Sequence, residues 1–578
     1  MDTAGLVMSA ASLALQLGQF GQKLLGPSPS LAASADTNTS SAEQRALEVD
    51  RDHEYQQTKT LSAVLFTSDT LGFKRKVLEG MSHKDQEVSL AILSQLFRLW
   101  SEYHDAQTTA LSAAGSAVLH PLEGVDVVSD AQHGLEAAAA GTTPEMVLQM
   151  LNTSQCERLK NLILTIGAWN RRLERTIRNA TWLQTLQTAT AEETMIRLDA
   201  IATDPNGVRL DLVTPARLRQ MVIIVGNPSI DKKSLTIPDL RMPSDCINVP
   251  PNLSSRQGVI SALYRKPASS KPVPVLIEFL PFTRSGNTGA NPHQYAKRRI
   301  DQLTALLHIP KKPEFRLPEA CGYFEDQERP RYGIVFLLSK LSPTIPTPKI
   351  TTLQSILHKS PASRPTLGSR FRLAHALACA VRNIQSIGWV HQNLRSENII
   401  FLLSALYQND STRDPDPASI YYQKPWIFGY GSSRLETVPS VGIHDDNPAR
   451  NLYRHPDRWG IMPCQRFNKY HDIYSLGVIL LEIGYWAPIT LLVAKDHLAS
   501  GAEPRRVMEN MLLLSGTSRL TSAVGESFAA VAKLCLMSSA EGFGFDGDCD
   551  DKLDSLLQAE FDRKVIDPLG RAADAICG

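Results

Sequence analysis

The segment GWVHQNLRSENIIF, residues 388–401, places several polar side chains between two apolar runs. Such a set could serve phosphoryl transfer, which needs a group to accept the proton of the attacking hydroxyl and oxygen ligands for a metal ion. Asn398 could supply a metal ligand. Asn393, two residues after His391, carries an amide that takes up no proton at neutral pH. The segment therefore offers a metal ligand, but its asparagines cannot act as the base.

The residues around this loop predict the elements that position it. Four β-branched and aromatic runs are typical of strands, at 258–267, 273–282, 320–326 and 331–341. An amphipathic helix at 293–308 is expected between the second and third strands, and an apolar-periodic helix at 370–389 leads directly into the loop. These elements predict an α+β fold for the C-terminal half of the chain.

Residues 255–578 resemble a eukaryotic protein kinase domain. The loop residues that match the family's His-Arg-Asp-Leu-Lys-Pro-Glu-Asn pattern in type or position are His391, Leu394, Arg395, Glu397 and Asn398. Further on, YRHP includes Arg454 and Pro456 and stands where the family's Ala-Pro-Glu segment closes the activation loop. Asp472 begins DIYSLGVILLEIG, which resembles the long helix that anchors this loop. The resemblance implies a bilobal fold, with a small lobe at 255–340 and a large lobe at 341–578.

The positions that handle ATP in active kinases have changed. Glu278 in VLIEF stands at the position of the phosphate-binding lysine. Two unit charges ~4 Å apart interact by about 4 kcal/mol at an effective dielectric near 20, so a glutamate here would repel a phosphate that the lysine attracts. Gly429, followed by Tyr430, replaces the metal-binding aspartate of Asp-Phe-Gly, and only Gly258 remains of the glycine-rich loop. With Asn393, four requirements fail together. We expect a pseudokinase that binds no ATP or Mg²⁺ and holds no other metal.

Residues that support the fold remain, and one insertion leaves an alternative open. We expect Asp472 to cap its helix and brace the loop backbone, and His391 to pack beneath it. Asp410, Asp414 and Asp416 in the insertion at 404–423 could replace a lost carboxylate, although the turn-rich composition favours a solvated loop.

The composition of the chain narrows the classes of protein to which it could belong. The chain has 578 residues, enough for several domains, and its 60 basic and 59 acidic residues give no overall attraction to nucleic acid. The eight cysteines form no CxxC pair, which favours reduced thiols in a cytoplasmic protein over disulfides or a zinc site.

The N-terminal half predicts an all-α bundle over residues 1–225, followed by a proline-rich linker at 226–254. Apolar residues recur at helical spacing over 85–105 and 144–177, and further helices are expected around 181–203 and near 214–224. Two segments predict no regular structure: the linker at 26–44 and the Ala/Gly/Thr-rich stretch at 105–143.

The first residues suggest a membrane-active helix. Residues 3–22 carry no formal charge, and Asp2 argues against a signal peptide. The apolar residues that would contact lipid are Leu6, Leu13, Leu17 and Phe20. Burial in the bundle explains the same pattern, so both interpretations stay open.

The kinase-like motifs also resemble a fungal group of degenerate kinase-like domains that often follow a helical domain of the prion-inhibition-and-propagation (HeLo) type. The opening MDTAGLVMSAASLALQLGQF is similar to the start of that helical domain. The resemblance implies a role in cell death or self/non-self recognition, with protein partners, oligomerisation on activation and recruitment to membrane through residues 3–22. The alternatives are a protein-binding scaffold without membrane activity and a divergent ATP-binding kinase that relies on Asn398.

Overall fold

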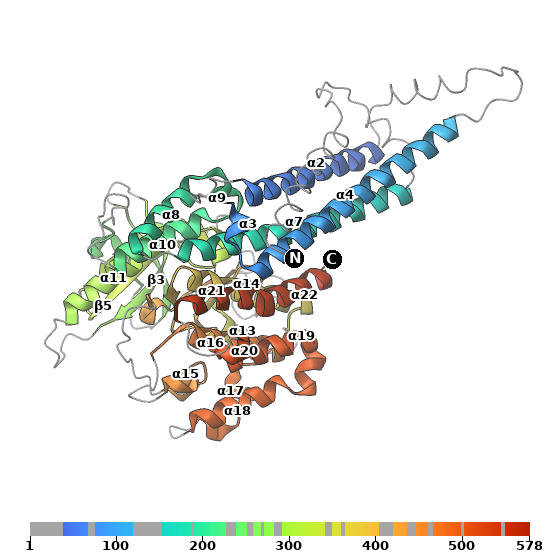
Figure 1. Ribbon diagram of the computed structural model, residues 1–578. Helices are drawn as coiled ribbons and strands as arrows, with labels where there is room; N and C mark the ends of the chain where they lie inside the picture. Colours follow the sequence, from blue (N-terminus) through green and yellow to red (C-terminus); the bar gives the residue numbers. More distant parts are fainter. Residues whose placement is uncertain are drawn as a thin grey trace, which may run out of the picture. The chain divides into compact units, whose positions relative to one another are not determined.

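A computed structural model describes most of the chain (Figure 1). The described residues are 39–67, 76–118, 153–187, 190–226, 239–250, 258–266, 271–282, 292–341, 349–359, 364–403, 420–435, 447–459, 466–498, 502–544 and 550–577. The chain divides into two compact units, residues 1–188 with 200–212 and residues 189–199 with 213–578. The predicted division at residue 225 differs, because α10 (Val213–Gly226) belongs to the second unit, where the side chain of Gln302 donates to the carbonyl of Val225 (3.0 Å).

The first unit is helical, as predicted. Its elements are α2 (Thr39–Phe66), α3 (Val77–Gly80), α4 (His83–Val118), α7 (Thr153–Leu186), α9 (Pro205–Arg209) and the end of α8 (Ala191–Thr203). Both α2 and α4 pack against α7. The three helices also share buried polar contacts, since Trp100 Nε1 donates to Thr58 Oγ1 (3.2 Å), which itself donates to Asn170 Oδ1 (2.8 Å). These contacts fix the register of α2 and α4 on α7.

Several predicted boundaries in this unit are wrong. α4 continues to Val118, so residues 105–118 are helical; this stretch is rich in alanine, the strongest helix former. α2 begins at Thr39, inside the predicted linker 26–44. The helix expected over 181–203 is the end of α7 followed by α8. The predicted helix at 3–22, with Leu6, Leu13, Leu17 and Phe20, lies outside the described residues.

A five-stranded antiparallel sheet begins the second unit, in the order β1-β2-β3-β5-β4. Its strands are β1 (Ile247–Asn248), β2 (Val259–Tyr264), β3 (Val273–Pro281), β4 (Ala320–Glu325) and β5 (Arg331–Leu337), and α11 (Pro292–His308) packs on β4. The four predicted strands and the helix are confirmed, but the strand predicted over 331–341 ends at Leu337, and residues 338–341 form a short helix. The stretch 226–254, predicted to be a linker, supplies β1 as an edge strand.

Alternation along β3 determines which way Glu278 faces. Val275, Ile277 and Phe279 belong to a small cluster on one face of the sheet, whereas Leu276 and Leu280 belong to the large core. Because successive side chains point to opposite faces, Glu278 faces the large core with Leu276. A carboxylate is thus directed into the interior of the second unit.

The rest of the second unit is mostly helical. Its elements are α12 (Leu338–Leu341), β6 (Lys349–Thr352), α13 (Leu353–Leu357), α14 (Leu367–Ser386), β7 (Trp389–Val390), β8 (Ile399–Leu403), β9 (Trp426–Ile427), β10 (Arg434–Leu435), α15 (Pro448–Asn451), α16 (Lys469–Tyr485), α17 (Ile489–Leu492), α18 (Pro504–Ser515), α19 (Ser518–Met537), α20 (Ala540–Phe543), α21 (Asp550–Phe561) and α22 (Asp567–Cys577). Nearly every residue of α16 is buried, and this helix packs against α14 and α19 (Figure 1). The chain therefore combines a helical unit with an α+β unit.

By length and composition, α19 is the one helix among the described residues that could cross a membrane. Its packing accounts for the apolar composition instead, because Leu520, Val524 and Phe528 are buried in the large core. The helix also has a non-helical residue, Gly525, at φ 81°. α19 is a core helix of the second unit.

Candidate functional site

Asp472 anchors the loop of residues 391–398, here called the His391 loop. Its buried carboxylate accepts the backbone N–H groups of His391 (2.7 Å) and Gln392 (2.9 Å). The expectation that Asp472 caps α16 is wrong, because Asn468 is the N-cap. Bracing of the loop backbone by Asp472 is confirmed.

Buried His391 packs beneath this loop as expected. Its ring lies edge-on to Tyr430, with centroids 5.5 Å apart. Burial lowers the pKa of His391 to about 3, so the ring is neutral at physiological pH. Leu394 is buried in the large core. Both residues serve packing.

The two asparagines of the His391 loop bind backbone atoms. Asn398 Nδ2 donates to the carbonyl of Asn393 (2.7 Å), and Asn393 Nδ2 donates to the carbonyl of Gly429 (3.0 Å). The side chain at the predicted base position is thus a donor to the segment 428–433, here called the Gly429 loop. Asn398 holds Asn393 in place for this contact.

Glu278 reaches the same loop from β3. Its Oε2 accepts the N–H of Gly429 (3.1 Å) and its Oε1 accepts the N–H of Tyr430 (2.6 Å). Burial raises the pKa of Glu278 to about 7, opposed by the hydrogen bonds from the backbone of Gly429, Tyr430 and Gly431. The carboxylate faces protein amides from a buried position, so it is not a solvent-facing base.

Gly429 has no room for a side chain. Its φ of 94° lies in the left-handed region that favours glycine. A Cβ atom there would lie 2.3 Å from Asn398 Nδ2 and 3.1 Å from Asn393 Nδ2. An aspartate at this position would collide with the amides that hold the loop.

Arg299 of α11 completes the site and was missed by the sequence analysis. Its guanidinium donates to the carbonyl of Gly431, and burial lowers its pKa. Because its partner is a backbone carbonyl, the sequence carries no complementary residue that would have signalled the contact. Together, Glu278, Arg299, Asn393, Asn398 and the Gly429 loop form what we call the Glu278 cluster.

Among the remaining predicted residues, Glu397 joins the His391 loop to the following segment, and Arg454 and Pro456 make contacts within that segment. Arg395 Nε lies 3.0 Å from Glu397 Oε2, and Arg450 Nε lies 3.8 Å from the same oxygen. The carbonyl of Arg454 accepts from Trp459 Nε1 (2.9 Å), and Pro456 begins a 3₁₀ turn. None of these residues contributes to the Glu278 cluster.

Among the described residues, one group of side chains has the geometry of metal ligands: His455, Asp457 and His471, whose ligand atoms lie within 4.8 Å of one another. The hydrogen bonding of His471 does not suit a metal. Its Nδ1 accepts the N–H of Asn468 (2.9 Å), which leaves the proton of the neutral ring on Nε2.

Comparisons with known proteins give no further guide to the class of this site. No protein-family model matches the chain, and a search of curated proteins found no match.

Proposed function

We propose that the second unit is a catalytically inactive kinase-like domain, a pseudokinase, that regulates the N-terminal helical region in a fungal cell-death or self/non-self response. One observation supports the inference that the domain is inactive: Glu278 binds the amides of Gly429 and Tyr430 with both carboxylate oxygens.

The charges of the Glu278 cluster support this proposal. In active kinases a lysine on the third strand pairs with a glutamate on the following helix, and together they position the phosphates. Here the strand β3 carries Glu278 and the helix α11 carries Arg299. Both side chains bind backbone atoms of the Gly429 loop. A buried carboxylate repels phosphate, and Gly429 offers no side-chain ligand to a metal.

The His391 loop supports the same conclusion. Asn393 donates to the carbonyl of Gly429, so its amide nitrogen serves the resting structure. No group of this cluster is placed to accept a proton from a bound hydroxyl. The cluster closes the loop against the strand, which suits a domain whose conformation, rather than chemistry, transmits a signal.

Regulation is tested by breaking the cluster in the full-length protein. Dye release from anionic liposomes would be measured for the wild type, for Glu278→Lys, and for Glu278→Lys lacking residues 1–24. We expect little release by the wild type, release by Glu278→Lys, and its loss when residues 1–24 are removed. Release that does not need residues 1–24 would exclude the predicted membrane helix at 3–22.

The two rival functions correspond to other outcomes. If no variant binds or permeabilises liposomes, the protein is better described as a protein-binding scaffold. Saturable binding of ATP with Mg²⁺ to the full-length wild type, measured by isothermal titration calorimetry, would support a divergent kinase and overturn the pseudokinase proposal.

A further inference from the structure

A cysteine and a histidine of α14, outside the Glu278 cluster, make the contact that a nucleophilic thiol needs. His375 and Cys379 stand one turn apart and share a face of the helix. Nε2 of His375 lies 3.6 Å from Sγ of Cys379, within hydrogen-bonding range for a sulfur atom. Both residues are partly exposed, whereas Cys535 is buried. The pair therefore has the composition of a thiol beside its general base.

The packing of α22 on α14 limits where the His375 ring can lie. Gly570 of α22 is the residue that faces the ring. A Cβ atom on Gly570 would lie 3.0 Å from His375 Nε2, closer than side chains normally approach. The glycine thus leaves room for the imidazole nitrogen that lies beside the sulfur.

Two arginines interact with the charge of a Cys379 thiolate. Burial lowers the pKa of Arg316, which follows the 3₁₀ turn Pro313–Phe315, whereas Glu314 and the thiolate act to raise it. Burial also acts to lower the pKa of Arg382, but Asp562, 3.0 Å away, and the thiolate raise it overall. Because each interaction is mutual, both arginines favour the thiolate over the thiol. The two acids offset part of this effect.

Two other cysteines of the second unit have the opposite environment. Burial raises the pKa of Cys321 to about 11, although Lys340 and Lys266 act to lower it. Burial also raises the pKa of Cys535 above its usual range. Both remain protonated near neutral pH, and a thiol is a far weaker nucleophile than a thiolate. Cys321 and Cys535 therefore serve as internal references for the reactivity of Cys379.

We propose that Cys379, with His375 as its base, is a site of oxidation by hydrogen peroxide, a small uncharged oxidant that suits a partly exposed sulfur. His375 takes the thiol proton, and the sulfur attacks one peroxide oxygen. A sulfur–oxygen bond forms as the oxygen–oxygen bond breaks. The sulfur loses two electrons and becomes a sulfenic acid, and the second oxygen leaves as water with the proton that His375 returns. The inference does not rest on the proposed function, because it uses neither the Glu278 cluster nor the N-terminal helix.

The first test measures the nucleophile without the oxidant. The reduced full-length protein would be treated with iodoacetamide at several pH values, and mass spectrometry of its peptides would give the alkylation rate of each cysteine. At about pH 7 we expect Cys379 to react about tenfold faster than the partly exposed Cys246. Near pH 10 the difference should disappear, because both thiols are then ionised. Equal rates at about pH 7 would overturn the proposal.

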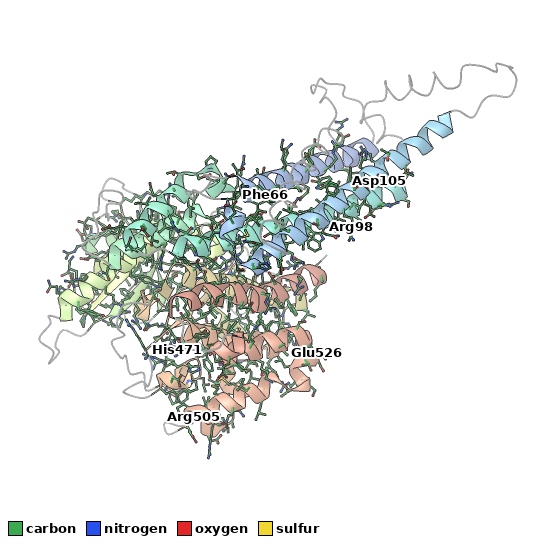
Figure 2. All side chains as sticks on the ribbon, viewed as in Figure 1. Phe66, Arg98, Asp105, His471, Arg505 and Glu526 are labelled. Atoms are coloured by element: carbon green, nitrogen blue, oxygen red, sulfur yellow. The ribbon has the colours of Figure 1, made fainter. Side chains whose placement is uncertain are left out.

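Variants separate the base from the surrounding charge. His375→Gln should slow alkylation of Cys379 about tenfold at neutral pH and leave it unchanged near pH 10, where no base is needed. Arg316→Gln should slow it about twofold to threefold at neutral pH. Arg505→Gln, at an exposed position of α18 that is labelled in Figure 2, removes the same charge elsewhere and should react as the wild type does. Equal slowing by His375→Gln at both pH values would mean that the ring only controls access to the sulfur, and would overturn its role as base.

The second test follows the oxidation itself. The full-length protein would be treated with hydrogen peroxide at neutral pH in the presence of dimedone, which traps sulfenic acids, and its peptides would be examined by mass spectrometry. We expect dimedone on Cys379 ahead of Cys321 and Cys535, and about tenfold less of it in His375→Gln. Absence of dimedone from Cys379, or equal labelling of the three cysteines, would contradict the proposal. Circular dichroism melting would show whether His375→Gln is folded; if it is not, the pH profile of Cys379 in the wild type decides the question.

Discussion

Two buried glutamates of the second unit, Glu278 on β3 and Glu482 on α16, have the same degree of burial but different partners. Burial raises the pKa of each to about 7. Glu278 uses both oxygens, one for each of two backbone amides. The hydrogen bonds to Glu482 all end on Oε1, which accepts from Tyr453 Oη (2.7 Å), the N–H of Ile489 (2.9 Å) and, at a longer distance, Ser396 Oγ (3.3 Å). Its Oε2 accepts no hydrogen bond from the described residues.

This difference separates a structural carboxylate from one that controls a loop. Two of the three donors to Glu482 are hydroxyls, which can rotate when the acid changes its charge, and all three share one oxygen. Both donors to Glu278 are backbone amides, which cannot rotate, and each is bound by an oxygen of its own. Burial and pKa alone would not have distinguished the two sites; their partners do.

The largest effect on stability is expected from Glu278→Lys, which removes the two hydrogen bonds of one of these glutamates. The change places a buried cation against two N–H donors and should lower the free energy of unfolding by about 3–5 kcal/mol. Chemical denaturation of the full-length protein would measure it. The control is Glu526→Lys, at an exposed position of α19 that is labelled in Figure 2, which should change stability by less than about 0.5 kcal/mol. Similar losses in both variants would contradict the assigned role of Glu278.

The two acids together should make stability fall with rising pH. Each has a pKa of about 7 in the folded protein against an ordinary value of 4.5, so the folded state binds more protons between these values. The stabilisation is present below pH 4.5 and is lost as pH rises through 7, by about 3 kcal/mol for each acid. Denaturation between pH 5 and 8 would show it. Glu278→Gln and Glu482→Gln should each flatten the slope, and an unchanged slope in either variant would mean that its acid is not the titrating group.

Gly429→Ala tests the loop that Glu278 binds. The left-handed φ and the 2.3 Å approach to Asn398 Nδ2 should cost about 1–3 kcal/mol, measured by denaturation. Gly431→Ala two residues later is the matched control, because a Cβ there meets no atom within 4 Å. Equal stability of the two variants would show that the loop can move away from Asn398.

The smallest effect is local and separates the two acids directly. In Glu278→Gln only one oxygen remains for two amides, so hydrogen exchange at Gly429 or Tyr430 should quicken about fivefold to tenfold, as expected for about 1 kcal/mol. In Glu482→Gln the remaining oxygen can keep all its donors, so exchange at Ile489 should stay unchanged. Hydrogen–deuterium exchange with mass spectrometry would read both. Faster exchange at Ile489 would show that Oε2 of Glu482 stabilises this site without a hydrogen bond from the described residues.

Local patterns predicted the elements of the fold better than their boundaries. The strands at 258–267 and 331–341 were predicted because β-branched and aromatic residues mark them, whereas β1 has only two residues among prolines. The helix at 105–118 was missed because its alanines form no apolar stripe. The membership of α10 in the second unit depends on tertiary contacts, which periodicity does not encode.

The site was predicted residue by residue but not as a cluster. Glu278, Asn393 and Gly429 are predicted as three separate losses, yet Glu278 and Gly429 are 151 positions apart in the sequence, and no spacing rule connects them. Arg299 was missed because its partner is a carbonyl. The contacts that join these residues involve backbone atoms, which every residue has, so the sequence contains no trace of the pairing.

The lack of space at Gly429 also bears on how such a chain can evolve. A return to catalysis from the proposed pseudokinase would require a lysine at 278, an aspartate at 393 and an aspartate at 429. Lysine at 278 would oppose two amide donors, and a side chain at 429 would collide with Asn398. Both single changes would therefore destabilise the loop before any catalytic group could act, so under the proposed function the contacts of the Glu278 cluster would themselves oppose a stepwise return to catalysis.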